Sequence, residues 1–300
     1  MKDVVVLPGP ASLELGNFIA ARLKTISIPI DLRVFSDGES KIRFDANTNL
    51  LNKKCIVVQS TYPPVDSHIL QTLMIISGCY ESGASEVIAV MPYMGYARQD
   101  RKFLEGEIVT ISLIARLLEC INVRNLITVD IHSIKSLSYF NLNILNISSI
   151  NSLATYAITK LNLVNPIVVS PDIGGISRAK EFSERIHSNF FALKKIRDRV
   201  TGNVVMDKNL QVDITDHDII IIDDMISSGE TILKALDLLK KNQCGKIYAM
   251  CVHALCDENS INKLKTAGLT DLVSTNSVPR SCSKVDLGMD ITNALSSILC

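Results

Sequence analysis

The stretch that most constrains the fold runs from Ile219 to Thr231, Ile-Ile-Ile-Ile-Asp-Asp-Met-Ile-Ser-Ser-Gly-Glu-Thr, and a helical pattern follows over Ile232–Lys241. Four consecutive isoleucines predict a strand that is buried on both faces of a parallel sheet, and Asp223–Asp224 mark the point where this strand meets water. Open α/β sheets bind their ligands at the carboxyl edge of the strands. The sequence therefore predicts a strand, a ligand-binding loop and a helix, in that order.

The loop itself combines small hydroxyl residues with Gly229. The first turn of the following helix presents unpaired N–H groups and a positive dipole end, which together favour a phosphate. Asp223 and Asp224 can accept hydrogen bonds from a vicinal diol. We rank a ribose phosphate above an ordinary strand with its helix cap. We also rank it above a Walker B strand, because the chain contains no G-x-x-x-x-G-K-[ST] segment.

The segment Asp223–Thr231 resembles the phosphoribosyl diphosphate (PRPP) loop that type I phosphoribosyltransferases share with PRPP synthetases. The resemblance implies a set of residues that bind ribose 5-phosphate. They are Asp223, Asp224, Ser227, Ser228, Gly229, Glu230 and Thr231. This loop alone does not separate the two families.

Length and composition narrow the alternatives. Three hundred residues predict two domains, and 31 basic against 31 acidic residues leave no overall basic field to attract nucleic acid or anionic lipid. The eight cysteines lack metal-ligand spacing, which is typical of a reducing compartment. Asp3 and Pro8 interrupt any signal peptide, and no apolar run approaches the length of a membrane span. We expect a soluble, cytoplasmic protein without nucleic-acid or membrane partners.

Predicted strands and helices alternate along the chain, which indicates an α/β fold with parallel sheets. Strands are expected at Lys54–Gln59, Glu86–Met91 and Leu126–Ile131, and a second pattern in the same order begins near Asn151. We therefore predict two similar domains, residues 1–148 and 149–284, with a C-terminal helix over 285–300 that packs back. The resemblance implies that each domain has the type I phosphoribosyltransferase-like fold, a mainly parallel sheet flanked by helices.

A second informative segment is Pro92–Lys102, Pro-Tyr-Met-Gly-Tyr-Ala-Arg-Gln-Asp-Arg-Lys. Aromatic rings and cations beyond a strand end can stack on a base and bind phosphate oxygens, although a charged loop can also be merely solvated. The whole segment resembles the PRPP synthetase signature, which transferases that consume PRPP lack. The resemblance implies that Arg98 and Gln99 bind ATP.

The segment Arg33–Glu39, Arg-Val-Phe-Ser-Asp-Gly-Glu, predicts by itself only a chain reversal. It is similar to the F-x-D-G-E segment with which PRPP synthetases reach across a subunit contact to ATP. The resemblance implies that Asp37, Gly38 and Glu39 bind ATP. It also implies a homo-oligomer, a dimer or larger, with the ATP site at a subunit contact.

Two further segments are candidates for binding a diphosphate and a metal. In Ser170-Pro171-Asp172-Ile173-Gly174-Gly175, paired glycines before a helix predict a second anion loop. This segment resembles the family's diphosphate loop, in which Ile173 replaces the usual histidine or acid. His132 follows a strand end, where a histidine is usually structural, but the family pattern has a metal-binding histidine there. The resemblance thus implies Mg²⁺ near His132 and Asp172, and this ion needs few protein ligands.

The basic run Lys194–Arg199 follows a predicted strand and could simply be solvated. In PRPP synthetases a K-x-R sequence at this point lies on a mobile catalytic loop. Lys195 and Arg197 match it and are implied to be catalytic, while Lys194 offers a competing alignment.

Taken together, the resemblance covers nearly the whole chain, looks closest to archaeal-type members, and implies ribose-phosphate diphosphokinase activity that converts ATP and ribose 5-phosphate into AMP and PRPP. A phosphoribosyltransferase and a catalytically silent regulatory homologue are the alternatives. The sharpest departure is Glu230, which stands where the family usually has glycine. Because a carboxylate would repel the sugar phosphate, we expect Glu230 to have φ below zero, to join the first helical turn and to point outward.

Overall fold

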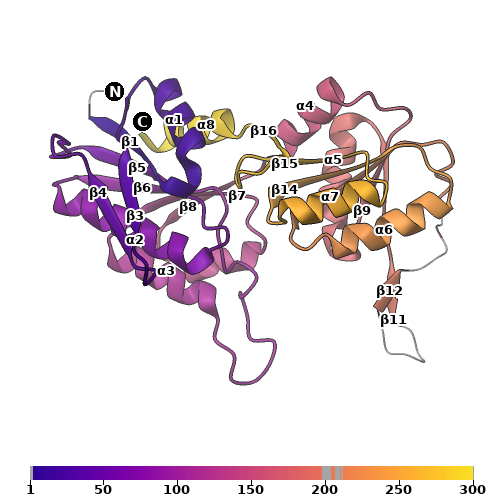
Figure 1. The fold of residues 1–300 in the computed structure, drawn as a ribbon, viewed down its shortest axis with the longest axis horizontal. Helices are drawn as coiled ribbons and strands as arrows, with labels where there is room; N and C mark the ends of the chain where they lie inside the picture. The colour runs from indigo at the N-terminus through magenta and orange to yellow at the C-terminus, as the bar shows by residue number, and fades with distance from the viewer. Residues whose placement is uncertain (1–2, 198–203, 207–209, 211, 300) are drawn as a thin grey trace. The chain divides into compact units, whose positions relative to one another are not determined.

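The computed structural model of the chain describes residues 3–197, 204–206, 210 and 212–299. Its internal contacts divide it into two compact units, each built around a six-stranded sheet (Figure 1). Unit 1 comprises Met1–Ser148, Ser277–Pro279 and Asp286–Cys300, and unit 2 comprises Ser149–Asn276 and Arg280–Val285.

The sheet of unit 1 has the strand order β2-β1-β5-β6-β7-β8, and every neighbouring pair is parallel. Its strands are β1 (Val4–Pro8), β2 (Ile26–Ser27), β5 (Lys54–Val58), β6 (Glu86–Met91), β7 (Asn125–Val129) and β8 (Asn143–Ile147). Its helices are α1 (Leu13–Leu23), α2 (Val65–Glu81), α3 (Thr110–Cys120) and α8 (Gly288–Leu299).

The sheet of unit 2 repeats this topology in the order β10-β9-β13-β14-β15-β16, again with parallel neighbours. Its strands are β9 (Ile167–Ser170), β10 (Asn189–Ala192), β13 (Ile219–Ile226), β14 (Ile247–Ala254), β15 (Asp271–Thr275) and β16 (Ser283–Val285). Its helices are α4 (Ile150–Lys160), α5 (Ile176–Ile186), α6 (Glu230–Lys241) and α7 (Glu258–Thr266). The predicted α/β fold with two similar parallel sheets is confirmed.

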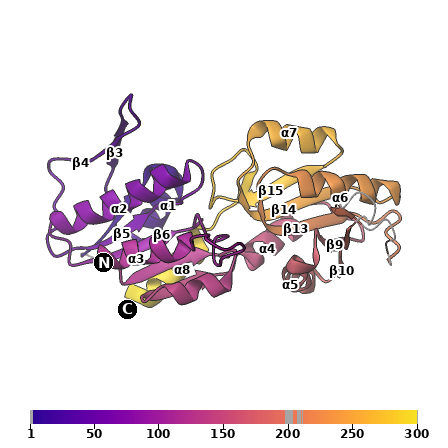
Figure 2. The ribbon, with the colours of Figure 1, turned by 90° about the horizontal axis from the view of Figure 1, so that it is seen from below.

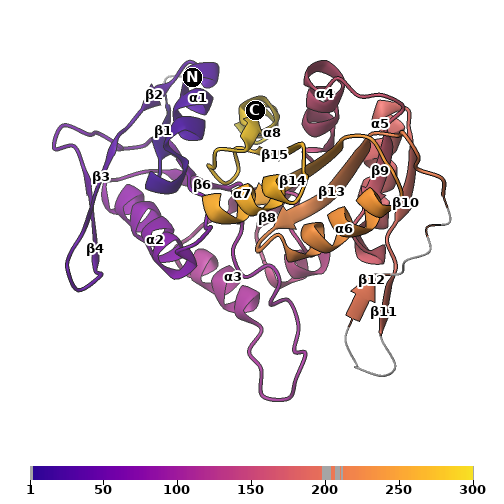
Figure 3. The same ribbon diagram turned by 45° about the vertical axis from the view of Figure 1, so that its right-hand side comes forward.

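Burial explains why the central strands are parallel. The first four residues of β13 and all eight of β14 are buried, so these strands need helices on both faces. A crossover between parallel strands is right-handed, so the face on which its helix lies depends on the direction in which the chain moves along the sheet. Crossovers that run in opposite directions therefore cover opposite faces. In unit 1, α2 and α3 lie on one face while α1 packs beside α8 on the other (Figures 1 and 3). The carboxyl ends of the strands remain available for loops.

Two antiparallel hairpins stand outside the sheets. In unit 1, β3 (Ile30–Val34) pairs with β4 (Ser40–Phe44), and this hairpin projects away from the sheet (Figure 2). In unit 2, β11 (Lys195–Arg197) pairs with β12 (Val204–Met206). The residues Arg33–Glu39 predict by themselves only a reversal, whereas the structure shows that this turn joins two paired strands.

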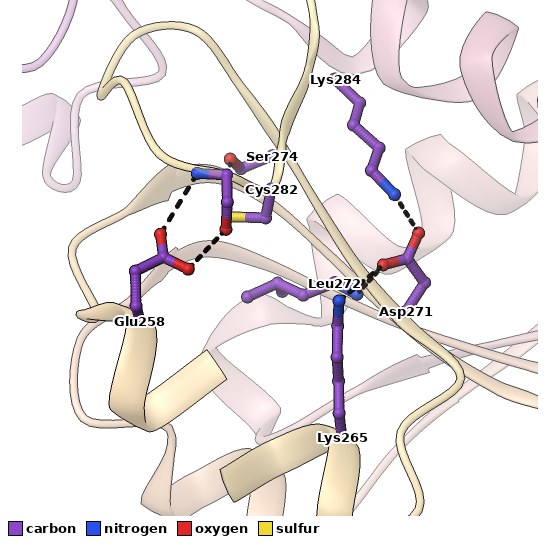
Figure 4. Close-up of polar contacts among 8 residues, drawn as sticks. Glu258, Lys265, Asp271, Leu272, Ser274, Cys282 and Lys284 are labelled. Carbon is purple, nitrogen blue, oxygen red and sulfur yellow. Dashed lines mark hydrogen bonds and ion pairs between the residues drawn. The ribbon is translucent and has the colours of Figure 1, made fainter. Parts of the chain in front are cut away.

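Side-chain contacts fasten the edge of the unit 2 sheet (Figure 4). The ammonium of Lys284 on β16 contacts the Asp271 carboxylate at the start of β15, and the Lys265 ammonium lies 3.8 Å from the same carboxylate. Glu258 at the start of α7 accepts a 2.7 Å hydrogen bond from the Ser281 hydroxyl. These contacts hold the short β16 in place, although its three residues offer few backbone hydrogen bonds.

In the part of the chain that the structure describes, no helix has both the length and the apolar character needed to cross a membrane.

Candidate active site

The carboxylates of Asp223 and Asp224 lie in unit 2, inside β13 rather than at its end. The sequence predicts that the strand meets water at Asp223, but β13 continues to Ile226 because its neighbour β14 is equally long and pairs with it as far as Ala254. Pairing with the shorter β9 stops at Ile221. Asp223 and Asp224 therefore lie just past the last β13–β9 pair, and both are half-buried.

Asp223 is held close to a second and a third carboxylate. Burial, the hydrogen bond and negative charge of Asp224, and the charge of Asp172 raise the pKa of Asp223 to about 8, although the Asp224 backbone N–H donates to its Oδ1 at 2.9 Å. The charge of Asp172, from the loop after β9, thus acts on Asp223, whose neighbour on β13 is Asp224. A cation, or the hydroxyl donors of a sugar, would favour the charged form of Asp223.

The loop after β13 is open to ligands. Ser227 and Ser228 are exposed, and Gly229 is the N-cap of α6 with φ 76°. A side chain at Gly229 would be strained at this φ, and its Cβ would approach a Leu264 methyl group to 3.2 Å. The N–H groups of the first turn of α6 are therefore left beside small, exposed hydroxyls, an arrangement that suits a phosphate.

Glu230 is the first residue of α6, its side chain is exposed, and it is not among the residues with positive φ. Its backbone N–H lies 3.4 Å from the Ser228 hydroxyl oxygen. The expected backbone conformation and helical position are confirmed.

The loop after β9 leads through a short 3₁₀ helix, η3 (Ile173–Gly175), into α5. The Asp172 carboxylate caps η3 by accepting a 3.2 Å hydrogen bond from the Gly175 N–H. Gly175 is packed so closely that a Cβ would come within 2.6 Å of the Ser170 hydroxyl oxygen. Gly174 and Gly175 thus bring backbone close to the side of the site that carries Asp172.

In unit 1 the loop after β6 presents Arg98 and Gln99 as exposed residues. Asp100 beside them is buried and anchors the loop, because its Oδ2 accepts a 2.6 Å hydrogen bond from the Ser133 hydroxyl. Ser133 adjoins His132, which is exposed in the loop after β7. The hydrogen bond between Ser133 and Asp100 was not predicted from the sequence. Its only signal there was an acid in one strand-end loop and a hydroxyl next to the candidate histidine in another.

Asp37, Gly38 and Glu39 form the exposed tip of the β3–β4 hairpin. The Asp37 carboxylate accepts a 3.1 Å hydrogen bond from the Glu39 N–H, and the Phe35 N–H donates to the Glu39 carbonyl at 2.9 Å. The tip is therefore a defined turn with its side chains in solvent.

The candidate catalytic residues Lys195 and Arg197 are described only as backbone of β11. Their side chains lie outside the described part of the structure, as do residues 198–203. Lys194, the competing candidate, precedes β11 and is exposed.

No group of three or more histidine, cysteine, aspartate or glutamate side chains with metal-binding geometry occurs among the described residues. The two metal candidates belong to different units, His132 to unit 1 and Asp172 to unit 2. The acidic oxygens near Asp172 are nonetheless the donors that Mg²⁺ prefers, and a sparse donor set suits an ion that keeps several waters.

Comparison with known proteins assigns the chain to a family. Residues 4–121 match the N-terminal domain of ribose phosphate pyrophosphokinase, and residues 142–286 match the phosphoribosyl transferase domain. The ribose-phosphate pyrophosphokinase of Sulfurisphaera tokodaii is 33% identical, with 98% of this chain and 99% of that protein covered. The chain belongs to the ribose-phosphate pyrophosphokinase family.

Other members of the family support this assignment. The proteins of that name from Methanopyrus kandleri and Helicobacter hepaticus are 31% and 32% identical, with 98% and 93% of this chain and 99% and 89% of those proteins covered. The fold matches that of phosphoribosylpyrophosphate synthetase from Mycobacterium smegmatis with a TM-score of 0.87 at 22% identity, over 99% of each chain. The family and enzyme class predicted from the sequence, archaeal relatives included, are confirmed.

Proposed function

We propose that this enzyme transfers the diphosphate of ATP to the anomeric hydroxyl of ribose 5-phosphate, forming PRPP and AMP for nucleotide biosynthesis. The observation that supports it best is the set of carboxylates Asp172, Asp223 and Asp224 together with the loop after β13, in which Ser227 and Ser228 are exposed. Carboxylates that accept hydrogen bonds from the ribose hydroxyls and N–H groups that bind the 5-phosphate suit one ligand, a phosphorylated ribose.

Different residues of this chain bind the sugar, bind the nucleotide and stabilise the transferring diphosphate. The loop residues Ser227–Thr231 bind the sugar phosphate, and Asp223 and Asp224 orient the ribose so that its anomeric oxygen attacks the β-phosphorus of ATP in line. Arg98 and Gln99 bind the nucleotide. Gly174 offers its backbone N–H group to the transferring diphosphate, and Gly175, whose own N–H donates to Asp172, lets the loop approach closely. Lys195 and Arg197 stabilise the charge that develops on the diphosphate.

Mg²⁺ is the cofactor that we expect, and its candidate ligands are Asp172 in unit 2 and His132 in unit 1, each of which would bind it directly or through water. When bound, it supplies neutralisation of the phosphate charge. Because the pKa of Asp223 is raised without a cation, we expect a bound ion to favour the ionised form of this carboxyl.

A homo-oligomer completes the proposal. The tip residues Asp37, Gly38 and Glu39 would contact ATP bound to a second subunit, and the exposed Val34 and Phe35 on the same hairpin supply apolar surface for such a contact.

One assay tests the reaction. The purified enzyme is incubated with ATP, Mg²⁺ and ribose 5-phosphate, and the proposal requires AMP and PRPP in equal amounts. Consumption of added PRPP with a free base, or no reaction at all, would favour a phosphoribosyltransferase or a catalytically silent homologue instead.

Replacing Arg98 with alanine is expected to weaken ATP binding by about tenfold or more, because a charge-assisted hydrogen bond is lost. Ribose 5-phosphate binding should be almost unchanged, since the sugar loop belongs to unit 2. Calorimetry with each ligand measures the two affinities. Arg124→Ala is the matched control, because Arg124 precedes β7 at the opposite edge of the same sheet. Equal losses for both ligands would contradict this division.

Replacing Glu230 with glutamine should change the KM for ribose 5-phosphate by less than about threefold, because an exposed charge in the first helical turn interacts only weakly. Steady-state kinetics with varied ribose 5-phosphate measures this. A fall in KM of about tenfold or more would show that the carboxylate faces the phosphate, as expected for charge repulsion inside a site.

A further inference from the structure

Equivalent loops of the two sheets differ in exposure to solvent. β5 and β13 occupy the same third place in their sheets, and each is followed by a loop and a helix, α2 and α6. Ser227 and Ser228 of the unit 2 loop are exposed, whereas Ser60 and Thr61 of the unit 1 loop are 0% exposed. In unit 1 the position that corresponds to the phosphate loop is thus filled by the chain itself.

The segment that fills it begins directly after β6. The Thr61 hydroxyl accepts a 2.7 Å hydrogen bond from the Gly95 N–H and donates to the Tyr93 carbonyl at 3.0 Å. The Ser60 hydroxyl accepts from the Tyr93 N–H at 3.1 Å and donates to the Ser277 carbonyl at 2.5 Å. Each buried hydroxyl therefore acts as both donor and acceptor, so neither can be removed without leaving a buried polar group unsatisfied.

Packing reinforces these hydrogen bonds. A Cβ on Gly95 would lie 2.6 Å from a Val65 methyl group and 2.9 Å from the Thr61 carbonyl oxygen, so only glycine lets the two loops approach this closely. Tyr96, with φ 62°, donates its hydroxyl to the Asp66 carboxylate in the first turn of α2. The Gln99 N–H then donates to the Tyr96 carbonyl at 2.9 Å. The turn that carries Arg98 and Gln99 consequently rests on residues 60–66.

We propose that Ser60 and Thr61 are positioning residues for ATP: their buried hydroxyls hold Tyr93 and Gly95 and thereby fix the turn that presents Arg98 and Gln99. This inference rests on the proposed function, in which these two exposed residues bind the nucleotide. The loop of unit 1 then has a role that differs from its counterpart in unit 2. It binds a segment of the protein, and that segment binds the ligand.

The test removes one hydroxyl without changing the shape of its side chain. Thr61→Val is compared with Thr61→Ser, which keeps the hydroxyl, and with Thr128→Val. Thr128 is also a fully buried threonine of the unit 1 sheet, and its hydroxyl has no hydrogen-bond partner among the described residues. Tyr96→Phe, which removes only the contact with Asp66, is a second variant at a half-buried position in case Thr61→Val does not fold.

In Thr61→Val we expect the Kd and KM for ATP to rise about 5- to 20-fold, as for one unsatisfied buried donor, while the KM for ribose 5-phosphate changes by less than about twofold. Hydrogen exchange of the Gly95 amide should accelerate in the full-length protein without ligands. Thr61→Ser should restore both properties, Tyr96→Phe should show a smaller shift in the same direction, and Thr128→Val should show none.

Normal ATP affinity and unchanged Gly95 exchange in Thr61→Val, with an active parent enzyme, would overturn this inference alone. Equal effects on ATP and ribose 5-phosphate, or the same effects in Thr128→Val, would also overturn it, because they would indicate a general loss of stability. If the parent enzyme itself formed no PRPP and bound no ATP, the proposed function would fail, and the inference with it.

Discussion

The Asp223→Asn enzyme is expected to lose at least about 100-fold in kcat/KM for ribose 5-phosphate, since a carboxylate that accepts from two hydroxyls contributes more than one charge-assisted hydrogen bond. Steady-state kinetics measures this loss. Asp237→Asn is the matched control, because Asp237 is an exposed carboxylate on α6 whose only ion pair among the described residues is with Lys241, one turn away. Near-normal kinetics in Asp223→Asn would remove this residue from the site.

The same substitution should stabilise the ligand-free protein at alkaline pH. Because the folded-state pKa of Asp223 is raised to about 8, the native state binds more protons than the unfolded state between about pH 4 and pH 8. The contribution of this group to stability therefore falls as pH rises through that window. Asparagine carries no charge and can still accept the hydrogen bond from the Asp224 N–H.

We expect the Tm of Asp223→Asn to exceed that of the parent by at least about 3 °C at pH 8, and the difference to vanish near pH 4. Thermal unfolding of both proteins over this pH range measures the difference. Mg²⁺ with ribose 5-phosphate should raise the Tm of the parent more than that of the variant. A Tm difference that is constant with pH would show that the two states do not differ in the protonation of Asp223.

Lys195→Ala is expected to lower kcat by about 100-fold or more, because removal of one preorganised charge donor costs about this much transition-state stabilisation. Binding of ATP in the absence of ribose 5-phosphate should change little, since the charge is needed only as the diphosphate is transferred. Single-turnover kinetics and calorimetry separate the two properties.

Lys194→Ala is the control for Lys195→Ala, because Lys194 is the exposed neighbour that precedes β11. We expect its turnover to remain within about threefold of the parent, as for a solvated surface charge. If Lys194→Ala lost turnover and Lys195→Ala did not, the catalytic alignment would be displaced by one residue.

Local sequence was enough to predict much of this fold and of its candidate site. The aliphatic run Ile219–Ile222, two acids, a small hydroxyl loop and Gly229 predict a buried strand, a turn and a helix start, because burial, backbone freedom and helix capping are decided by neighbours in the chain. The order of such segments also predicted two similar sheets, which the strand orders confirm. The position of Glu230 in the first turn of α6 was expected from charge, because a carboxylate that pointed inward would repel a sugar phosphate.

Short edge elements could not be found in this way. The two residues of β2 and the three of β16 are too short to carry a periodic pattern, and β3 and β4 were hidden behind a turn signal. Their pairing depends on which strand lies beside them, and that is known only once the sheet is formed. The continuation of β13 past Asp223 has the same origin, because it is the length of β14 that extends the ladder.

By itself, the sequence determined which residues carry charge, which of the longer segments are strands and helices, and where loops of small residues precede a helix. Only the tertiary structure decided which of these meet. It buried Asp223 and placed Asp172 of another loop where its charge acts on that carboxyl, so that burial first, and then Asp224 and Asp172, raise the pKa of Asp223. It also buried Ser60 and Thr61, which hydrogen-bond to Tyr93 and Gly95. Local preferences are set by each residue and its neighbours in the chain, whereas these contacts join segments that only a completed parallel sheet places side by side.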